Sequence, residues 1–385
     1  MEWHTTPITE ELVRGAVELE RTEHGLLPHR LPEWARRQCP DDQLLMAESQ
    51  PSGVRLVFRT RATQVELDTV RVTTTYKGVP PRPDCFYDLL VDGELAAQST
   101  QPAGQVVELD MSTGAADVRR GPGGTARFVG LPDLDKEVEL WLPWSETTHL
   151  VELRTDAPVQ PASNTRRVWL HHGSSISQGS VAEGPSTTWP ALAARQGGVD
   201  LVNLGLAGSA LLDPFTARTM RDIPADLVSV KIGINLVNHD LLRRRGFGPA
   251  VHGFLDTIRE GHPTAPLLVV SPVLCPMHEE TPGPGSFDVE ALGEGIVRFR
   301  AMGDPKEVAA GKLTLRVIRE ELERIVDQRR EGDPAIHYLD GLSLYGEPDH
   351  ERLPLPDALH PDAESHRLIG ERFAEAAFGS GGPFG

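Results

Sequence analysis

The feature that most constrains this chain is a change in its hydrophobic pattern near residue 160. Before that point, apolar and polar residues alternate in short runs such as residues 54–59, which is typical of β-strands. After it, short apolar runs alternate with longer stretches of helical spacing. Because the two patterns build different kinds of sheet, we expect two domains, residues 1–160 and residues 166–385.

Short strands dominate the pattern of the N-terminal domain. Residues 86–91 run directly into Asp92-Gly93, a pair that favours a tight hairpin turn. Further strand-like runs lie at residues 54–59, 65–72, 106–109, 138–142 and 149–153. Short strands and turns at this spacing predict an antiparallel β-sandwich of jelly-roll type.

The C-terminal domain shows five short apolar runs that alternate with helical patterns. We expect its strands at residues 167–171, 201–203, 226–232, 267–271 and 336–340. We expect helices at residues 187–196, 254–259, 315–325 and 368–377. This alternation predicts a parallel sheet with helices on both faces. The Gly/Pro-rich residues 281–305 are expected to be a mobile insertion, and residues 379–385 a frayed tail.

Composition excludes several classes of protein. The 385 residues can bury a core without disulfide or metal support. A net charge of −18 disfavours nucleic-acid and membrane-surface binding as the main role. Three scattered cysteines indicate neither a disulfide framework nor a metal site, and we expect no resident cofactor. No apolar run could span a bilayer, and an acidic start disfavours a signal peptide, so we expect a cytoplasmic protein.

Polar residues follow four of the predicted strands. In an open parallel sheet, ligands bind beyond the carboxyl ends of the strands. The segments after these strands contain Gly173-Ser174-Ser175, then Gly208, then Gly233-Ile234-Asn235, and finally Asp357 and His360. Together they supply a hydroxyl, an imidazole, a carboxylate and amide donors at one rim of the sheet.

These four segments resemble the sequence blocks of the SGNH/GDSL acylhydrolase and acyltransferase family, in the family's order and over about residues 166–378. The resemblance implies a flavodoxin-like α/β/α three-layer sandwich with a five-stranded parallel sheet. It implies that Ser175 is the nucleophile, His360 the base and Asp357 its partner. The Ser175 and Gly208 backbone N–H groups and the Asn235 amide would form the oxyanion hole. Ser174 departs from the family, which has Asp there.

The two-domain arrangement resembles GDSL-type acyltransferases of aromatic polyketide (tetracycline-like) tailoring. It implies transfer of an acyl group from acyl-CoA, as co-substrate, through acyl-Ser175 to a hydroxyl of a small-molecule natural product. The sandwich would be an accessory domain, similar to carbohydrate-binding modules, that helps to form the acceptor cleft. Residues 243–245, three consecutive arginines, are a candidate contact for CoA, with a solvated helix end as the plainer interpretation. The oligomeric state stays open.

Other interpretations remain beside this one. The same blocks fit an esterase or deacetylase acting on an acylated carbohydrate or small ester, and Ser174 leaves room for a binding protein with a decayed active site. Ser175 and Asn235 could each merely cap a helix. His171 and His172 would ordinarily face solvent or bind the backbone. Trp141 and Trp144 could stack on a sugar, although packing is the commoner use of both side chains.

Overall fold

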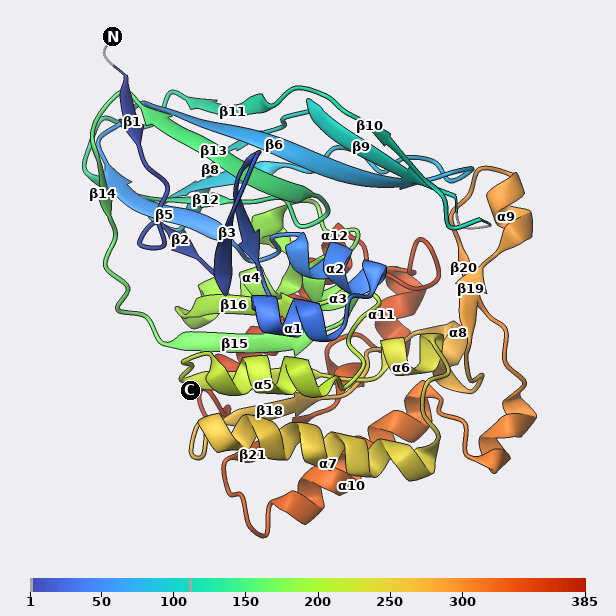
Figure 1. Ribbon diagram of the computed structural model, residues 1–385. Helices are drawn as coiled ribbons and strands as arrows, with labels where there is room; N and C mark the ends of the chain where they lie inside the picture. Colours follow the sequence, from blue (N-terminus) through green and yellow to red (C-terminus); the bar gives the residue numbers. More distant parts are fainter. Residues whose placement is uncertain (1–2, 111–112) are drawn as a thin grey trace. The chain divides into compact units, whose positions relative to one another are not determined.

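The computed structural model describes residues 3–110 and 113–385, which form two compact units (Figure 1). The first unit contains residues up to Glu33, Glu48–Thr165 and the short segment Glu183–Ser186. The second contains Trp34–Ala47, Arg166–Ala182 and Thr187–Gly385. Within the described ranges, no helix is long and apolar enough to cross a membrane.

Two β-sheets make up the first unit. The larger sheet contains β1 (His4–Thr6), β3 (Glu18–Thr22), β4 (Gly25–His29), β6 (Gln64–Tyr76), β9 (Gly104–Leu109), β10 (Ala116–Arg119), β11 (Gly124–Val129) and β13 (Thr147–Thr155). The smaller contains β2 (Val13–Arg14), β5 (Arg55–Thr60), β7 (Tyr87–Val91), β8 (Glu94–Ser99), β12 (Lys136–Trp141) and β14 (Val159–Pro161). Its strands pair antiparallel, as expected, and in the larger sheet β6 and β9 run parallel.

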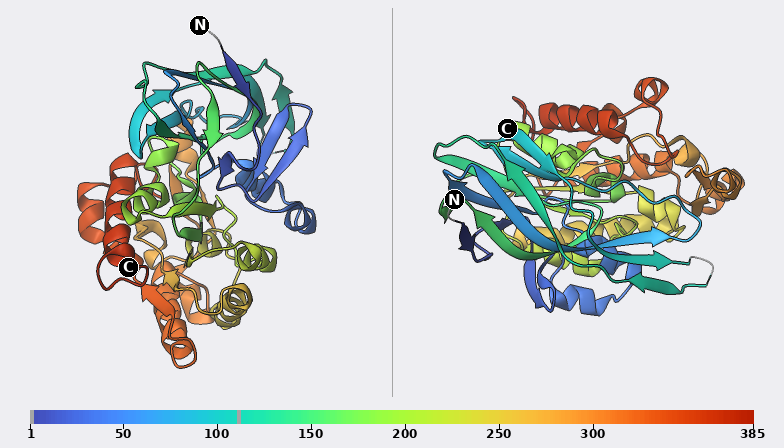
Figure 2. Two further views of the ribbon diagram at one scale, coloured as in Figure 1. Left: turned by 90° about the vertical axis from the view of Figure 1, so that its left-hand side faces the viewer. Right: turned by 90° about the horizontal axis from the view of Figure 1, so that it is seen from above.

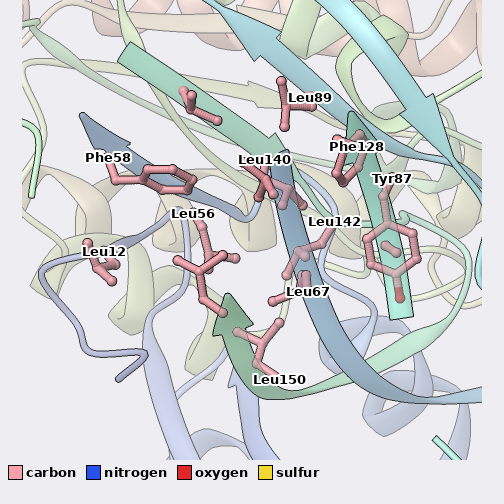
Figure 3. Close-up of a cluster of buried hydrophobic side chains, with 14 of the residues drawn as sticks. Leu12, Leu56, Phe58, Leu67, Tyr87, Leu89, Phe128, Leu140, Leu142 and Leu150 are labelled. Atoms are coloured by element: carbon pink, nitrogen blue, oxygen red, sulfur yellow. The ribbon is translucent and has the colours of Figure 1, made fainter. Parts of the chain in front are cut away.

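The β7–β8 hairpin forms at the predicted turn. Asp92 and Gly93 both have positive φ, 49° and 86°, which a two-residue hairpin of this twist requires. The alternation of residues along β5, β6 and β12 places Leu56, Phe58, Leu67 and Leu140 in a common core, each with 0% exposure (Figure 3). Removal of these side chains from water is the main force that holds the first unit together.

A five-stranded parallel sheet forms the centre of the second unit. Its order is β16–β15–β17–β18–β21, and every neighbouring pair is parallel. This is the flavodoxin-like order, and the strands lie where the apolar runs predicted them: β15 (Val168–Gly173), β16 (Asp200–Gly205), β17 (Leu227–Lys231), β18 (Leu267–Val270) and β21 (Ile336–Leu339). The predicted α/β fold with an N-terminal β-domain is therefore confirmed.

Helices cover both faces of this sheet (Figure 2). The principal ones are α4 (Trp189–Gly197), α5 (Pro214–Asp222), α7 (Arg244–Gly261), α10 (Leu315–Arg329) and α12 (Ala363–Phe378). The Trp169 ring stacks on Phe373 of α12 at 5.0 Å, whereas the His172 ring lies 5.7 Å from Phe254 of α7. Because Trp169 and His172 point to opposite sides of β15, α12 and α7 lie on opposite faces.

Shorter elements complete the second unit, and two of them extend by one or two residues into the first unit. They are α1 (Glu33–Gln38), α2 (Asp42–Ser49), α3 (Ser175–Gln178), α6 (Ile234–Asn238), α8 (Pro276–Glu279), α9 (Val289–Gly293), α11 (Glu347–Arg352), β19 (Gly285–Phe287), β20 (Phe299–Ala301) and the 3₁₀ turns η2 (Pro305–Ala310) and η3 (Gly341–Ser343). A further turn, η1 (Pro185–Thr187), spans the boundary between the two units. Helices α1 and α2 were not expected from the sequence.

Two expectations about irregular segments are corrected. Residues 281–305, expected to be a mobile insertion, contain regular structure, since β19 and β20 pair within them and α9 lies between. The C-terminal tail is not frayed: Phe384 is 0% exposed, its N–H donates to the Ala377 carbonyl, and its own carbonyl accepts a hydrogen bond from Arg167 at 2.7 Å. A buried aromatic ring fixes a tail whose glycines alone suggested mobility.

Candidate active site

Ser175 is the first residue of helix α3, directly beyond the carboxyl end of β15. Gly173 permits this sharp passage from strand to helix, because a Cβ at that position would clash with Ser177 Oγ. The Ser175 side chain is nearly buried, and its Oγ lies 3.0 Å from His360 Nε2. The hydroxyl is therefore held against an imidazole that could accept its proton.

Asp357 and His360 form a tight turn before helix α12. Asp357 Oδ2 accepts from His360 Nδ1 at 2.7 Å, and its Oδ1 accepts from the backbone N–H groups of Leu359 and His360. Burial opposes the charged form, but these hydrogen bonds outweigh it and lower the pKa of Asp357 below its ordinary value. An ionised carboxylate only accepts, so Nδ1 carries the ring proton and Nε2 is left to accept from Ser175.

Phe299 supports this turn from the insertion. Its N–H donates to the Asp357 carbonyl at 2.9 Å, and its ring meets the His360 ring edge-on at 5.8 Å. The sequence reasoning missed this residue. An aromatic side chain in a Gly/Pro-rich segment was the one signal that could have indicated an ordered role there.

Gly208 lies in the loop that follows β16, and Asn235 is the second residue of helix α6, which follows β17. Gly208 has φ +70°, which favours glycine, and Asn235 is held by a hydrogen bond from the Ala210 N–H to its Oδ1 at 3.2 Å. This bond uses the amide oxygen and leaves the Asn235 Nδ2 donors free. Within the described residues, neither these donors nor the Ser175 and Gly208 N–H groups bond to another group.

Hydrogen bonds tie these loops to the nucleophile. The Leu206 N–H donates to the Gly173 carbonyl at 2.8 Å, and the Ala207 N–H donates to Gln178 Oε1 at 2.9 Å. The structure thus joins Ser175, His360 and Asp357 by direct contacts, and links the segments of Gly208 and Asn235 to the same strand end.

The residues next to the nucleophile are buried. Ser174 is 1% exposed, and its Oγ has no hydrogen-bond partner among the described residues. His171 does not face solvent: its ring nitrogens contact Ser229 Oγ at 2.7 Å and Ser177 Oγ at 2.8 Å. Burial lowers the pKa of His171 well below its ordinary value, so this ring is a neutral structural link. His172 does bind the backbone, through the Leu204 carbonyl.

The other candidate residues have structural roles. Trp141 is buried, donates from Nε1 to Glu139 at 3.0 Å and lies under the Arg55 guanidinium. Trp144 is buried as well, so neither ring offers a face to a sugar. Arg244 pairs with Glu321 at 2.7 Å, which leaves the proposed contact of residues 243–245 with CoA a prediction. In the part of the chain that the structure describes, no group of three or more His, Cys, Asp or Glu side chains could hold a metal ion.

This arrangement suits acyl chemistry. A serine attacks a carbonyl when an adjacent base removes its proton, and the base needs a carboxylate that fixes its orientation. The negative charge that develops on the carbonyl oxygen needs preorganised N–H donors. Ser175, His360 and Asp357 meet the first requirement, and the N–H groups of Ser175 and Gly208, unbonded within the described residues, are candidates for the second.

Two family models match the chain. Residues 166–276 match the GDSL-like lipase/acylhydrolase family, and residues 12–150 match the N-terminal domain of SsfX3. No curated protein matches the sequence.

Solved structures extend this similarity to both domains. The salicylyl-acyltransferase SsfX3 from a tetracycline biosynthetic pathway is 32% identical, over 96% of this chain and 95% of that one, with a TM-score of 0.77. A GDSL-like lipase from Bacteroides ovatus ATCC 8483 is 18% identical over 97% and 96%, with a TM-score of 0.68. A family two carbohydrate esterase from Clostridium thermocellum is 14% identical over 84% and 91%, with a TM-score of 0.54. The latter two show a shared fold.

Proposed function

Because the chain belongs to the GDSL-like lipase/acylhydrolase family, and is a serine acyltransferase or esterase, we propose that it is an acyltransferase that uses acyl-Ser175 as its intermediate. The acyl donor would be a thioester such as acyl-CoA, and the acceptor a hydroxyl of a small-molecule natural product. A cytoplasmic location fits such a donor and remains a prediction.

The reaction follows from the contacts of Ser175. His360 Nε2 takes the Ser175 proton as Oγ attacks the thioester carbonyl, and Asp357 stabilises the imidazolium that forms. The oxyanion receives hydrogen bonds from the Ser175 and Gly208 N–H groups and from Asn235. The C–S bond then breaks, and His360 returns the proton to the departing thiolate.

In the second half of the reaction, His360 acts as a base toward the acceptor and as an acid toward Ser175. His360 removes the proton of the acceptor hydroxyl, whose oxygen attacks the acyl-Ser175 carbonyl. The ester product leaves, and Ser175 Oγ recovers its proton from His360. Water in place of the acceptor would give hydrolysis through the same groups, so the acceptor site decides between the two outcomes.

The observation that carries the proposal is the linked set of contacts from Ser175 to His360 at 3.0 Å and from His360 to Asp357 at 2.7 Å. Transferase rather than hydrolase activity is supported by the 32% identity to a salicylyl-acyltransferase across both domains. The intact contacts and the family membership argue against a decayed binding protein, despite Ser174. The shared fold of carbohydrate esterases keeps ester hydrolysis as the second candidate.

Mass spectrometry of the purified protein tests the proposal. The protein is exposed to a panel of acyl-CoA thioesters that includes salicylyl-CoA, with and without polyphenolic acceptors. We expect an acyl adduct on the peptide that carries Ser175, and transfer to an acceptor that is faster than release to water. The Ser175→Ala variant is the control and should form no adduct.

The same experiment separates the alternatives. Rapid acceptor-independent hydrolysis of simple esters would support the esterase. Failure of Ser175 to react with any thioester, or with a fluorophosphonate that labels active serines, would overturn the proposed function.

A further inference from the structure

We propose that Gln43, on helix α2, is a positioning residue that keeps the Gly208 N–H pointing toward the oxyanion, to which it donates a hydrogen bond. This inference rests on the proposed function, because it concerns the oxyanion hole of that reaction. Gln43 lies in the N-terminal part of the sequence, yet its segment belongs to the same compact unit as Ser175.

The central contact is a hydrogen bond from Gln43 Nε2 to the Ala207 carbonyl oxygen at 2.8 Å. The Ala207 C=O and the Gly208 N–H belong to one planar trans peptide unit, so they point in opposite directions. A bond that fixes the carbonyl on one side of the backbone therefore fixes the N–H on the other.

The peptide needs this restraint because Gly208 is conformationally permissive. Its φ is +70°, and turning the peptide by half a rotation would bring φ to about −110°, which glycine adopts just as readily. In the turned state the Ala207 carbonyl oxygen, not the Gly208 N–H, would face the developing negative charge. The oxyanion would then lose one hydrogen-bond donor and would face a carbonyl dipole that repels it.

Neighbouring peptide units of this loop are held by other side chains. The Ala207 N–H donates to Gln178 Oε1 at 2.9 Å, and the Gly208 carbonyl accepts from His239 Nε2 at 3.0 Å. The unit between them, which carries the Gly208 N–H, bonds only to Gln43 within the described ranges. Gln43 is thus the one restraint on the direction of this donor among the described residues.

Helix α2 holds Gln43 firmly. Asp41 Oδ1 accepts from the Leu44 N–H at 2.9 Å at the start of the helix, and Leu44 and Ala47 are buried. Gln43 also packs over Gly208: a Cβ on Gly208 would stand 3.2 Å from both Cγ and Nε2 of Gln43. The contact is therefore a close, anchored one.

Two substitutions test the role. Gln43→Glu keeps the shape of the side chain, but its carboxylate repels the Ala207 carbonyl and would accept from the Gly208 N–H of the turned peptide. We expect kcat for a simple aryl ester, and the rate of Ser175 labelling by a fluorophosphonate, to fall about 10- to 100-fold, with KM changed by less than about twofold. Gln43→Met only deletes the hydrogen bond, so it should lower kcat and the labelling rate less than Gln43→Glu does.

This order distinguishes positioning from packing. If Gln43 merely anchored α2, the isosteric Glu variant would be the milder one, and loss of activity would follow loss of thermal stability. The matched control is Gln38→Met, which removes a bond to Arg218 on α5 without touching the 207–208 peptide and should leave kcat unchanged.

The outcomes separate this inference from the proposed function. If the wild-type protein shows Ser175-dependent turnover and Gln43→Glu keeps its kcat within about twofold, the inference is wrong and the proposed function stands. If the wild-type protein shows no Ser175-dependent turnover or labelling, the proposed function fails, and the inference with it.

Discussion

The two units bury polar groups in different ways. In the sandwich, polar side chains bond to one another: Arg71 bonds to the buried Glu146 at 3.1 Å and to the exposed Asp84 at 2.7 Å. In the second unit, polar groups gather beyond the ends of parallel strands, and the N–H groups of Ser175 and Gly208 stay unbonded within the described residues. Polar side chains that bond to one another thus indicate structure, whereas backbone donors that are left unused indicate chemistry.

Asp357→Asn should cause the largest loss of kcat, and its effect should be confined to the second unit. The Asn oxygen can still accept the backbone N–H groups, but its amide cannot accept from His360 Nδ1, so the ring adopts the wrong tautomer. We expect kcat to fall about 10⁴-fold with little change in unfolding temperature. Steady-state kinetics and calorimetry measure the two quantities.

The control for this variant is Asp362→Asn, a nearby acidic residue that caps α12 through the Ser365 N–H. It should cost a little stability and leave kcat almost unchanged. An Asp357→Asn protein with wild-type kcat would show that the catalytic contacts have been misassigned.

Leu140→Ala should have the opposite result, a loss of stability without a loss of Ser175 reactivity. Leu140 has 0% exposure in the core of the sandwich, so truncation leaves a cavity and should lower the free energy of unfolding by about 2–5 kcal/mol. Denaturant unfolding measures the loss, and Ser175 labelling well below the transition should proceed at the wild-type rate.

Val129→Ala is the matched control, because Val129 is 69% exposed on β11 of the same unit. Its free energy of unfolding should change by less than about 0.5 kcal/mol. Equal losses for both variants would contradict the assignment of Leu140 to the core.

Glu146 should make the stability of the sandwich depend on pH. Burial raises the pKa of Glu146 to about 7, against the opposing influence of Arg71. The folded state therefore keeps a proton that the unfolded state loses above pH ~4.5, and stability falls as pH rises towards 7, by at most ~1.4 kcal/mol per pH unit.

Glu146→Gln should remove this slope between about pH 5 and 7. Urea unfolding of both proteins at several pH values measures the difference between them. A difference that does not vary with pH would show that Glu146 is charged throughout this range.

Much of the fold follows from hydrophobic spacing. The runs at residues 226–232 and 267–271 became β17 and β18 because a parallel strand covered on both faces must be apolar along its length. The same reasoning placed Ser175 and Asn235 after predicted strands, whereas their expected roles came from the resemblance to the SGNH/GDSL family.

Contacts that depend on tertiary packing were not predictable in this way. Helices α1 and α2 are short, and nothing in their pattern shows that Gln43 lies over Gly208. Similarly, Gly/Pro-rich composition concealed the contact of Phe299 with His360, and the tail offered only Phe384 as a sign of order. In each case the tertiary contact of one side chain orders a segment whose local sequence did not indicate that contact.

The assignment of Trp34–Ala47 to the second unit has a practical consequence for protein engineering. A chain truncated to begin at residue 166 would lack a helix that borders the proposed oxyanion loop, so its inactivity would say nothing about acceptor binding by the sandwich. Chimeras that exchange sandwiches between relatives need junctions on both sides of residues 34–47, so that this helical segment stays with the second unit.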